Sequence, residues 1–239
     1  MEEHVRRVHK GSVDAEETDM TIATLTLSHE REEVAAGARS LIYHHLSTAF
    51  AFPDDEFCRV LASGEWIDEL AHLTDHLPFA LDLDHPPVPD AGVLQESYVT
   101  VFDVGVGKPF CPLYEGSHRS GRMKLMEDLV RFYEYFGLKT TEGDHPDHLC
   151  AELDFMHYMA FKEAAALSHG DDVPDLRRAQ RDFLDRHLYR WLPRLQSRLE
   201  TGRDVQPLYV FLAGLVGEFC KKDRAFLKAG GGNPHEKVR

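Results

Sequence analysis

The chain has 239 residues, 43% of them hydrophobic, which is enough apolar material for one large domain or two small ones. Its formal net charge of −14 argues against a nucleic-acid-binding protein, because such proteins neutralise phosphates with clustered Lys and Arg. No apolar run approaches the roughly 20 residues of a membrane-spanning helix, so we expect no stable membrane insertion.

The N-terminal stretch, residues 1–28, is polar, mixed in charge and without hydrophobic periodicity, which predicts a flexible leader. Within it, Arg6-Arg7 resembles the start of a twin-arginine export signal, but no apolar segment follows. The cysteines are far apart and lack the close spacings of zinc or iron–sulfur sites, which favours free thiols in a reducing compartment. We therefore expect the protein to remain in the cytoplasm.

The first half of the chain predicts helices followed by a linker. Residues 30–52 have apolar groups at the spacing of one helical face, namely Val34, Ala38, Leu41, Ile42, Leu46, Ala49 and Phe50. Shorter helices are expected on either side of Gly64. Residues 78–89 are rich in Pro and cannot continue a helix, so they are expected to form a long linker between two halves.

The second half predicts further helices, although Tyr98 to Val106 alternates well enough to pass for a strand. We prefer a helix there, because the sequence offers no second strand to pair with it. The helices are expected near residues 90–102, 119–136, 146–167, 176–199 with a kink or break at Pro193, and 207–228, before a flexible tail over 229–239. The predicted fold is all-α, a single globular helical domain of about eight helices over residues 29–228 with a long central linker.

Two turn-rich segments, the hinge regions 103–119 and 139–148, bracket one of these predicted helices. The first contains Cys111-Pro112-Leu113-Tyr114-Glu115-Gly116, and the second leads into Pro146-Asp147-His148-Leu149-Cys150-Ala151-Glu152. Pro146 suits the first turn of the following helix, and Asp147 complements the positive end of that helix. His148 is one helical turn before Glu152, so both side chains are expected to project from one face.

Two interpretations of the hinges remain open. In the first, the second hinge is an ordinary capped helix with a hydrogen-bonded His. In the second, Glu115, Asp147 and Glu152 form the acidic rim of a partly apolar groove that accepts a basic, apolar peptide.

The second hinge also carries side chains that an enzyme could use, namely Asp144, His145, Asp147 and His148. A metal site needs three or four convergent ligands, and Asp154-x-x-His157 has no second pair of its kind in the chain. No Gly-x-Ser-x-Gly elbow or Gly-rich phosphate loop occurs. We expect no metal, no cofactor and no catalysis. A helical metal- or nucleotide-dependent enzyme built on this hinge is the alternative.

The order of the motifs resembles a known family. It runs Tyr98-x-x-x-Phe102-x-x-Gly105, Pro112-x-Tyr114-Glu115-x-x-x-Arg119, Gly137-Leu138 and Pro146-Asp147-His148-Leu149-x-x-Glu152-Leu153. This order is similar to that of the TorD/DmsD/NarJ family of redox-enzyme maturation chaperones, over roughly residues 34–226. The family hinge often has an acidic residue where this chain has His145, and its first hinge often reads Pro-Pro-Tyr-Glu-Ser. The Cys-Pro-Leu form resembles chaperones of type II enzymes of the dimethyl sulfoxide reductase family.

The resemblance implies a cytoplasmic, all-helical chaperone, monomeric or homodimeric. Such a chaperone binds the twin-arginine leader or catalytic subunit of a molybdenum oxidoreductase of the dimethyl sulfoxide reductase family and assists cofactor insertion before export. It implies partner binding at Tyr98, Phe102, Pro112, Tyr114, Glu115, Arg119, Pro146, Asp147, His148, Leu149 and Glu152. The sequence leaves open the client enzyme and whether a guanine nucleotide or the molybdenum cofactor is bound.

Overall fold

The computed structural model describes residues 13–103, 109–139 and 145–229, with side chains from residue 30 onward. These ranges contain ten α-helices and no strand, which confirms the all-α prediction. The helices are α1 (Val13–Ala49), α2 (Asp55–Ser63), α3 (Glu65–Thr74), α4 (Ala91–Phe102), α5 (Glu115–His118), α6 (Arg122–Tyr135), α7 (Leu149–Ser168), α8 (Pro174–Arg186), α9 (Leu188–Glu200) and α10 (Pro207–Lys228).

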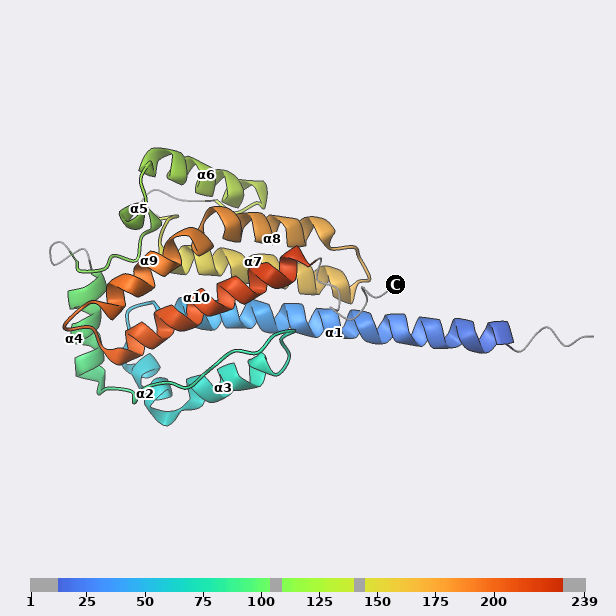
Figure 1. Cartoon of the computed structure of the whole chain (residues 1–239), viewed down its shortest axis with the longest axis horizontal. Coiled ribbons are helices and arrows are strands. Elements are labelled where there is room, and N and C mark those ends of the chain that lie inside the picture. The colour runs from blue at the N-terminus through green and yellow to red at the C-terminus, as the bar shows by residue number, and fades with distance from the viewer. Residues whose placement is uncertain (1–12, 104–108, 140–144, 230–239) are drawn as a thin grey trace, which may run out of the picture.

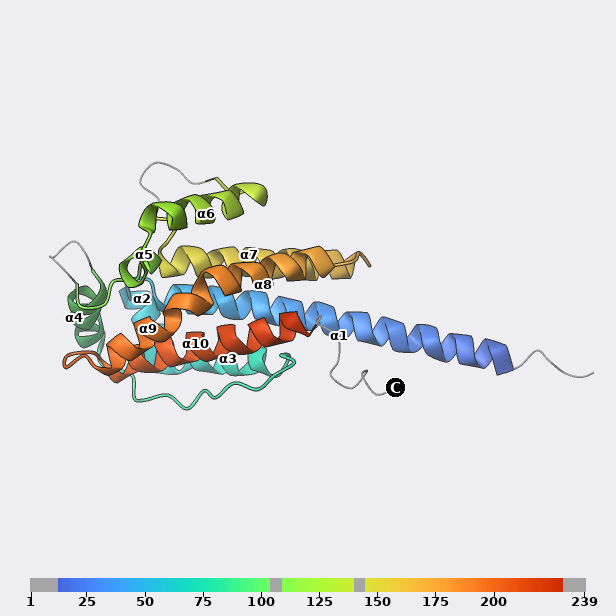
Figure 2. The same cartoon turned by 45° about the horizontal axis from the view of Figure 1, so that its top comes forward.

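The long helices α1, α7, α8 and α10 lie side by side and form the body of the molecule (Figures 1 and 2). Helices α2 and α3 cover one side of this body, while α5 and α6 lie on the opposite side (Figure 1). One continuous core joins the layers, and Leu46, Phe50, Leu153, Trp191 and Phe219 are among its fully buried members. Apolar stripes at helical spacing therefore meet in a single domain.

Helix α1 is longer than predicted, because it begins at Val13 and not near residue 30. No Gly or Pro interrupts residues 13–36, so the helical hydrogen bonds can continue without a breaker. The helix projects past the body of the molecule (Figure 1). A flexible leader over residues 1–28 stays a prediction, and residues 1–12 lie outside the described ranges.

Inside the body, most of the apolar stripe predicted along α1 is buried, namely Ala38, Ile42, Leu46, Ala49 and Phe50, but not all of it. Val34 and Leu41 are 48% and 46% exposed, whereas Arg39 and Tyr43 are fully buried. Arg39 donates to Glu163 of α7 at 2.7 Å and also to Gln180 and Asp223. The Tyr43 hydroxyl donates to Asp223 at 2.7 Å. We call Arg39, Tyr43, Glu163, Gln180 and Asp223 the buried charge cluster; it joins α1, α7, α8 and α10.

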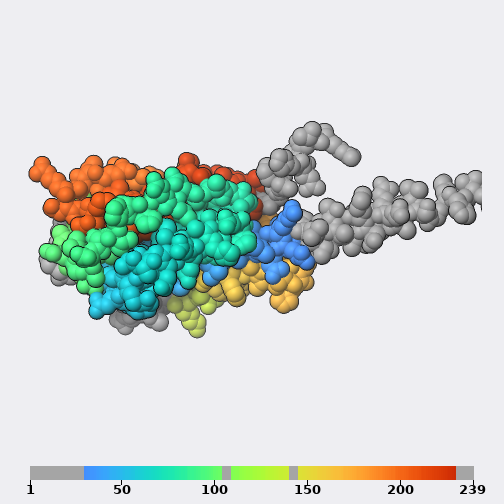
Figure 3. Space-filling model, turned by 90° about the horizontal axis from the view of Figure 1, so that it is seen from below, coloured from blue at the N-terminus to red at the C-terminus, as the bar shows by residue number. Residues whose placement is uncertain are grey.

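The linker between α3 and α4 has no helix over residues 75–90, as predicted, but it packs on the body instead of separating two halves. Lys222 of α10 donates to the Ala80 carbonyl at 2.7 Å, and the rings of Phe79 and Phe219 have centroids 6.1 Å apart. Figure 3 shows this stretch lying along the surface of the body. The extended linker thus helps to cover the core.

The count of helices exceeds the prediction because residues 176–199 do not form one helix. The break between α8 and α9 lies at His187, whose backbone angles are φ −118° and ψ −101°. The predicted break at Pro193 is wrong, since Pro193 lies inside α9. Its ring is exposed, and as the sixth residue of α9 it removes one helical hydrogen bond without ending the helix. The short helix α5 is the other addition.

Candidate functional site

The two hinges lie against each other in the structure. Tyr114 and His148 form an antiparallel β-bridge, and the centroids of their rings are 5.0 Å apart. On either side of that bridge, the Glu115 N–H donates to the Asp147 carbonyl and the Leu149 N–H donates to the Leu113 carbonyl, both at 2.8 Å. Main-chain bonds therefore join segments that are far apart in the sequence, at the start of α7.

His148 is the N-cap of α7, and its Nδ1 accepts from the Cys150 N–H at 3.2 Å. Burial lowers the pKa of His148, which favours the neutral ring that this acceptor role requires. The first helical residue is Leu149, so the prediction that Pro146 and Asp147 occupy the first turn is wrong. The helix begins three residues later than expected, because Pro146 and Asp147 form a turn in which the His148 N–H donates to the His145 carbonyl at 2.9 Å.

Asp147 holds the first hinge through its side chain as well. Its Oδ2 accepts from the Gly116 N–H at 3.2 Å, and the carboxylate is fully buried. A Cβ on Gly116 would lie 2.9 Å from that oxygen and 3.2 Å from Cγ of Arg122. The absence of a side chain at residue 116 is therefore a condition for this close approach.

The predicted acidic rim is wrong, because Glu115, Asp147 and Glu152 are all fully buried. Carboxylates leave water only where partners compensate for lost hydration. The Glu115 carboxylate is paired with Arg119 and accepts from His187 Nδ1 at 2.9 Å. These acids hold the hinges together and do not line an open groove in this conformation.

Glu152 is the third buried acid of the hinges. Its Oε2 accepts from the Trp191 indole N–H at 3.1 Å. Burial, and then the neighbouring Glu115 carboxylate, raise the pKa of Glu152 well above its usual range. Burial in the hinge network thus favours the protonated form of Glu152.

Several residues of this network were not anticipated from the sequence, and they come from α9 and its start. Trp191 stacks on His118 with ring centroids 5.3 Å apart, and His118 Nε2 donates to the Pro112 carbonyl at 2.7 Å. His187 reaches Glu115 from the break between α8 and α9. The irregular backbone at His187 had no local sequence signal, since no Gly or Pro stands there.

The remaining predicted binding residues divide between the hinges and α4. Arg119 donates to the Arg186 carbonyl at 2.8 Å, and the Pro146 carbonyl accepts from the Tyr133 hydroxyl at 2.8 Å. Tyr98 donates to the Phe50 carbonyl at 3.1 Å, and Phe102 is buried beside it. These two α4 residues are core contacts, and α4 is joined to the first hinge where the Cys111 N–H donates to the Val101 carbonyl at 2.7 Å.

Only those predicted residues whose side chains are partly exposed can contact a partner directly. The half-buried ones are Tyr98, Pro112, Tyr114, Arg119 and His148, whereas the buried ones are Phe102, Glu115, Pro146, Asp147, Leu149 and Glu152. Parts of the predicted hinge regions, residues 104–108 and 140–144, lie outside the described residues. Partner binding by the whole predicted set stays a prediction.

The His and Asp residues considered for an enzyme are likewise engaged in local contacts. The ring of His145 lies edge-on to Tyr114 with centroids 5.3 Å apart, and His157 Nδ1 lies 2.9 Å from the Ser40 hydroxyl. Asp144 lies outside the described residues. The part of the chain that the structure describes contains no group of three or more His, Cys, Asp or Glu side chains arranged to hold a metal ion.

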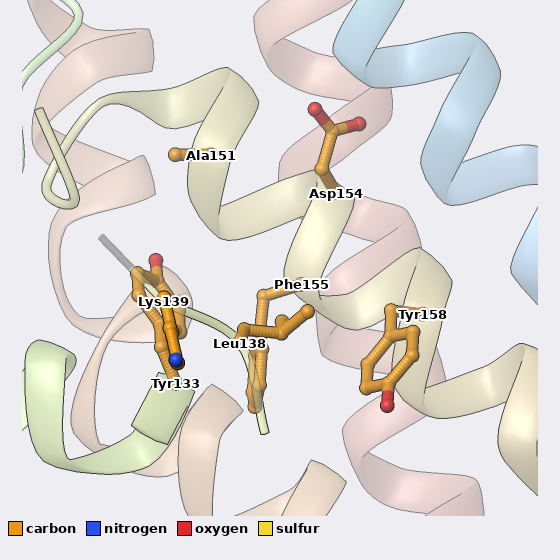
Figure 4. Close-up of a pocket in the computed structure, with 7 residues that line it drawn as sticks. All are labelled: Tyr133, Leu138, Lys139, Ala151, Asp154, Phe155 and Tyr158. Carbon is orange, nitrogen blue, oxygen red and sulfur yellow. The ribbon is translucent and has the colours of Figure 1, made fainter. Parts of the chain in front are cut away.

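A pocket of about 210 Å³ lies beside the hinges, between the end of α6 and the outer face of α7. It is lined by Tyr133, Leu138, Lys139, Ala151, Asp154, Phe155 and Tyr158 (Figure 4). Leu138 lies against the Phe155 ring in its centre, and the Asp154 carboxylate points away from them at the rim (Figure 4). Because Tyr133 also bonds to Pro146, this hinge pocket is coupled to the second hinge.

The structure is a helical bundle in which two hinges lie against each other beside a largely apolar pocket. These are features of a protein that binds another polypeptide. The chain belongs to the nitrate reductase delta subunit family, whose model matches residues 62–197. That range includes both hinges and every residue that lines the hinge pocket. The family predicted from the motifs is confirmed.

Relatives with known roles support the same family. The chain is 40% identical to the selenate reductase assembly chaperone protein of Thauera selenatis, over 77% of this chain and 87% of that protein. It is 32% identical to the chlorate reductase assembly chaperone protein of Ideonella dechloratans over the same shares. It is 33% identical to the dimethyl sulfide dehydrogenase assembly chaperone protein of Rhodovulum sulfidophilum, over 67% of this chain and 69% of that protein. The prediction of an assembly chaperone, as opposed to an enzyme, is confirmed at the level of the family.

None of the helices in the described ranges combines the length and the apolar character that crossing a membrane requires.

Proposed function

We propose that this chain is a cytoplasmic assembly chaperone for a molybdenum enzyme of the type II dimethyl sulfoxide reductase family, and that it binds the catalytic subunit before export. The observation that carries the proposal is the closed pair of hinges beside an apolar pocket, in a chain 40% identical to a selenate reductase assembly chaperone. Binding of the subunit's N-terminal leader would delay export until the cofactor is in place.

The structure supports different roles for the apolar residues and the arginines of a leader. Tyr114 and His148 are half-buried at the hinge bridge, and the hinge pocket presents Leu138, Phe155 and Tyr158. These side chains suit the apolar residues of a leader, since apolar burial contributes about 25 cal/mol per Å². The hinge acids are buried, so the leader's arginines are attracted by the overall charge of −14 and not by an acidic rim at the hinge.

These separate roles predict different binding kinetics for two altered leader peptides. Replacing both arginines of a leader with Gln is expected to slow association and to flatten its salt dependence, because steering by exposed charges is screened beyond about 8–10 Å at physiological salt. Replacing the apolar residues with Ser is expected to speed dissociation about tenfold or more. Biosensor kinetics at two ionic strengths, with the unaltered leader alongside, measures both rates.

A leader from the molybdenum enzyme encoded beside this chain is the appropriate probe. Binding weaker than about 100 μM, which corresponds to about 5.5 kcal/mol, would remove leader recognition from the proposal. Tyr158→Ser tests the pocket: it should reproduce the faster dissociation of the unaltered leader and leave its association unchanged. Tyr189→Ser, a partly exposed tyrosine on α9 outside the pocket, is the matched control.

A further inference from the structure

A second and larger hollow lies on another side of α6. This α6–α8 groove has a volume of about 520 Å³, and its apolar lining consists of Phe132, Tyr135 and Phe136 from α6 with Leu176 and Ala179 from α8. Figures 1 and 2 both show α6 alongside α8. Tyr135 is 82% exposed, so an aromatic ring stands open at the groove. The volume is within the range of about 300–1,000 Å³ that is typical of binding sites.

Charged side chains also line the groove, and most of them are paired within the chain. Arg131 donates to Glu127 at 2.8 Å, Arg178 is paired with Asp175, and Asp182 accepts from Arg181 at 3.0 Å. Such exposed pairs cancel most of the charge that the groove presents to a ligand.

Arg186 is the exception. Its guanidinium carbon lies 5.5 Å from the centroid of the Phe132 ring, and no carboxylate of the described residues lies within ion-pair distance of it. The nearby Arg119 is already paired with Glu115. An unpaired guanidinium that lies over an aromatic ring, at the edge of an apolar groove, is a receptor for a carboxylate.

We propose that the α6–α8 groove binds a second segment of the catalytic subunit, an amphipathic segment whose apolar side chains fill the groove and whose Asp or Glu pairs with Arg186. This rests on the proposed function, and it goes beyond leader recognition. A basic leader does not match the groove, because its arginines would face Arg186. The acid-bearing segment and the leader therefore occupy different sides of α6.

The inference is tested with peptides of about 20 residues that tile the catalytic subunit encoded beside this chain, measured by fluorescence anisotropy. We expect at least one apolar, acidic peptide outside the leader to bind. Changing its acid to the amide should weaken binding about tenfold, because a hydrogen bond between ionised groups is among the strong ones. When the protein carries Arg186→Gln, changing the peptide's acid to the amide should not weaken binding further, since the guanidinium that would pair with the acid is absent.

Arg190→Gln is the matched control, because Arg190 is exposed on the next helix and does not line the groove. Arg186→Gln keeps the backbone carbonyl that Arg119 uses, so the hinge contact is retained. The inference is overturned if the acid-to-amide change weakens peptide binding equally in Arg186→Gln and Arg190→Gln. It is also overturned if no peptide other than the leader binds. Either result leaves the proposed function intact. Failure of the leader and of every other peptide would instead overturn the proposed function.

Discussion

Replacing Arg39 with Met is expected to lower the free energy of unfolding by about 3–5 kcal/mol, the cost of breaking a buried ion pair by removing one partner. Arg39 is fully buried and bonds to Glu163, Gln180 and Asp223 at once. Without it, Glu163 keeps Arg177 as a partner, but Asp223 is left with the Tyr43 hydroxyl. A buried carboxylate with so little compensation favours the unfolded chain. Urea denaturation measures the loss.

Arg59→Met is the control, since Arg59 also pairs with a Glu, at 2.7 Å from Glu56, but both side chains are exposed. A pair in water is screened and is expected to contribute little. A second variant, Arg39→Met with Asp223→Asn, should recover part of the loss, because the unpaired charge is removed as well. If Arg39→Met unfolds at the same urea concentration as Arg59→Met, the buried charge cluster does not stabilise the fold as argued.

The same cluster shows where prediction from sequence succeeded and where it stopped. Helical spacing of apolar residues identified most helices, because burying one stripe of a helix is what creates that spacing. In α1, most of the predicted apolar stripe is buried, but Val34 and Leu41 are exposed, and the structure also buries Arg39. Periodicity cannot show that a charged side chain will find its partners on helices more than a hundred residues away.

The candidate site has a similar limit. The two hinges were identified from Tyr114-Glu115 and Pro146-Asp147-His148, since Pro and Gly nearby punctuate the helices. One interpretation placed their acids on the rim of a groove for a basic, apolar peptide. Arg119 and His187 compensate for the burial of Glu115, and Trp191 of α9 does so for Glu152. Asp147 accepts from the Gly116 N–H of the other hinge. The burial of these acids depends on partners that are distant in the sequence, and a local sequence pattern does not identify them.

Buried histidines contribute one part of the pH dependence of stability. Burial lowers the pKa of His118 and of His148, so both are kept neutral in the folded state. Their contribution is lost as the pH falls through the range where free imidazoles gain a proton, near pH 6.5. Glu152 acts in the opposite direction.

Glu152→Gln is expected to make the protein more stable at alkaline pH and to leave its stability near pH 4 almost unchanged. The folded state raises the pKa of Glu152, mainly by burial and then through Glu115, so it holds a proton that the unfolded chain releases. This contribution is fully present below the unfolded pKa of about 4.3. It is lost as the pH rises toward the folded pKa, by up to about 1.4 kcal/mol per pH unit.

Gln cannot ionise and keeps an oxygen that accepts from the Trp191 indole, so the variant retains the hinge contact without the titration. Urea denaturation at a series of pH values gives the difference in unfolding free energy between the two proteins, in which the histidine contributions cancel. That difference should grow steadily with pH, whereas Glu134→Gln, a change at an exposed position on α6, should give a flat line. A flat line for Glu152→Gln would mean that no proton is held between the hinges, and that closing them does not depend on the protonation of this acid.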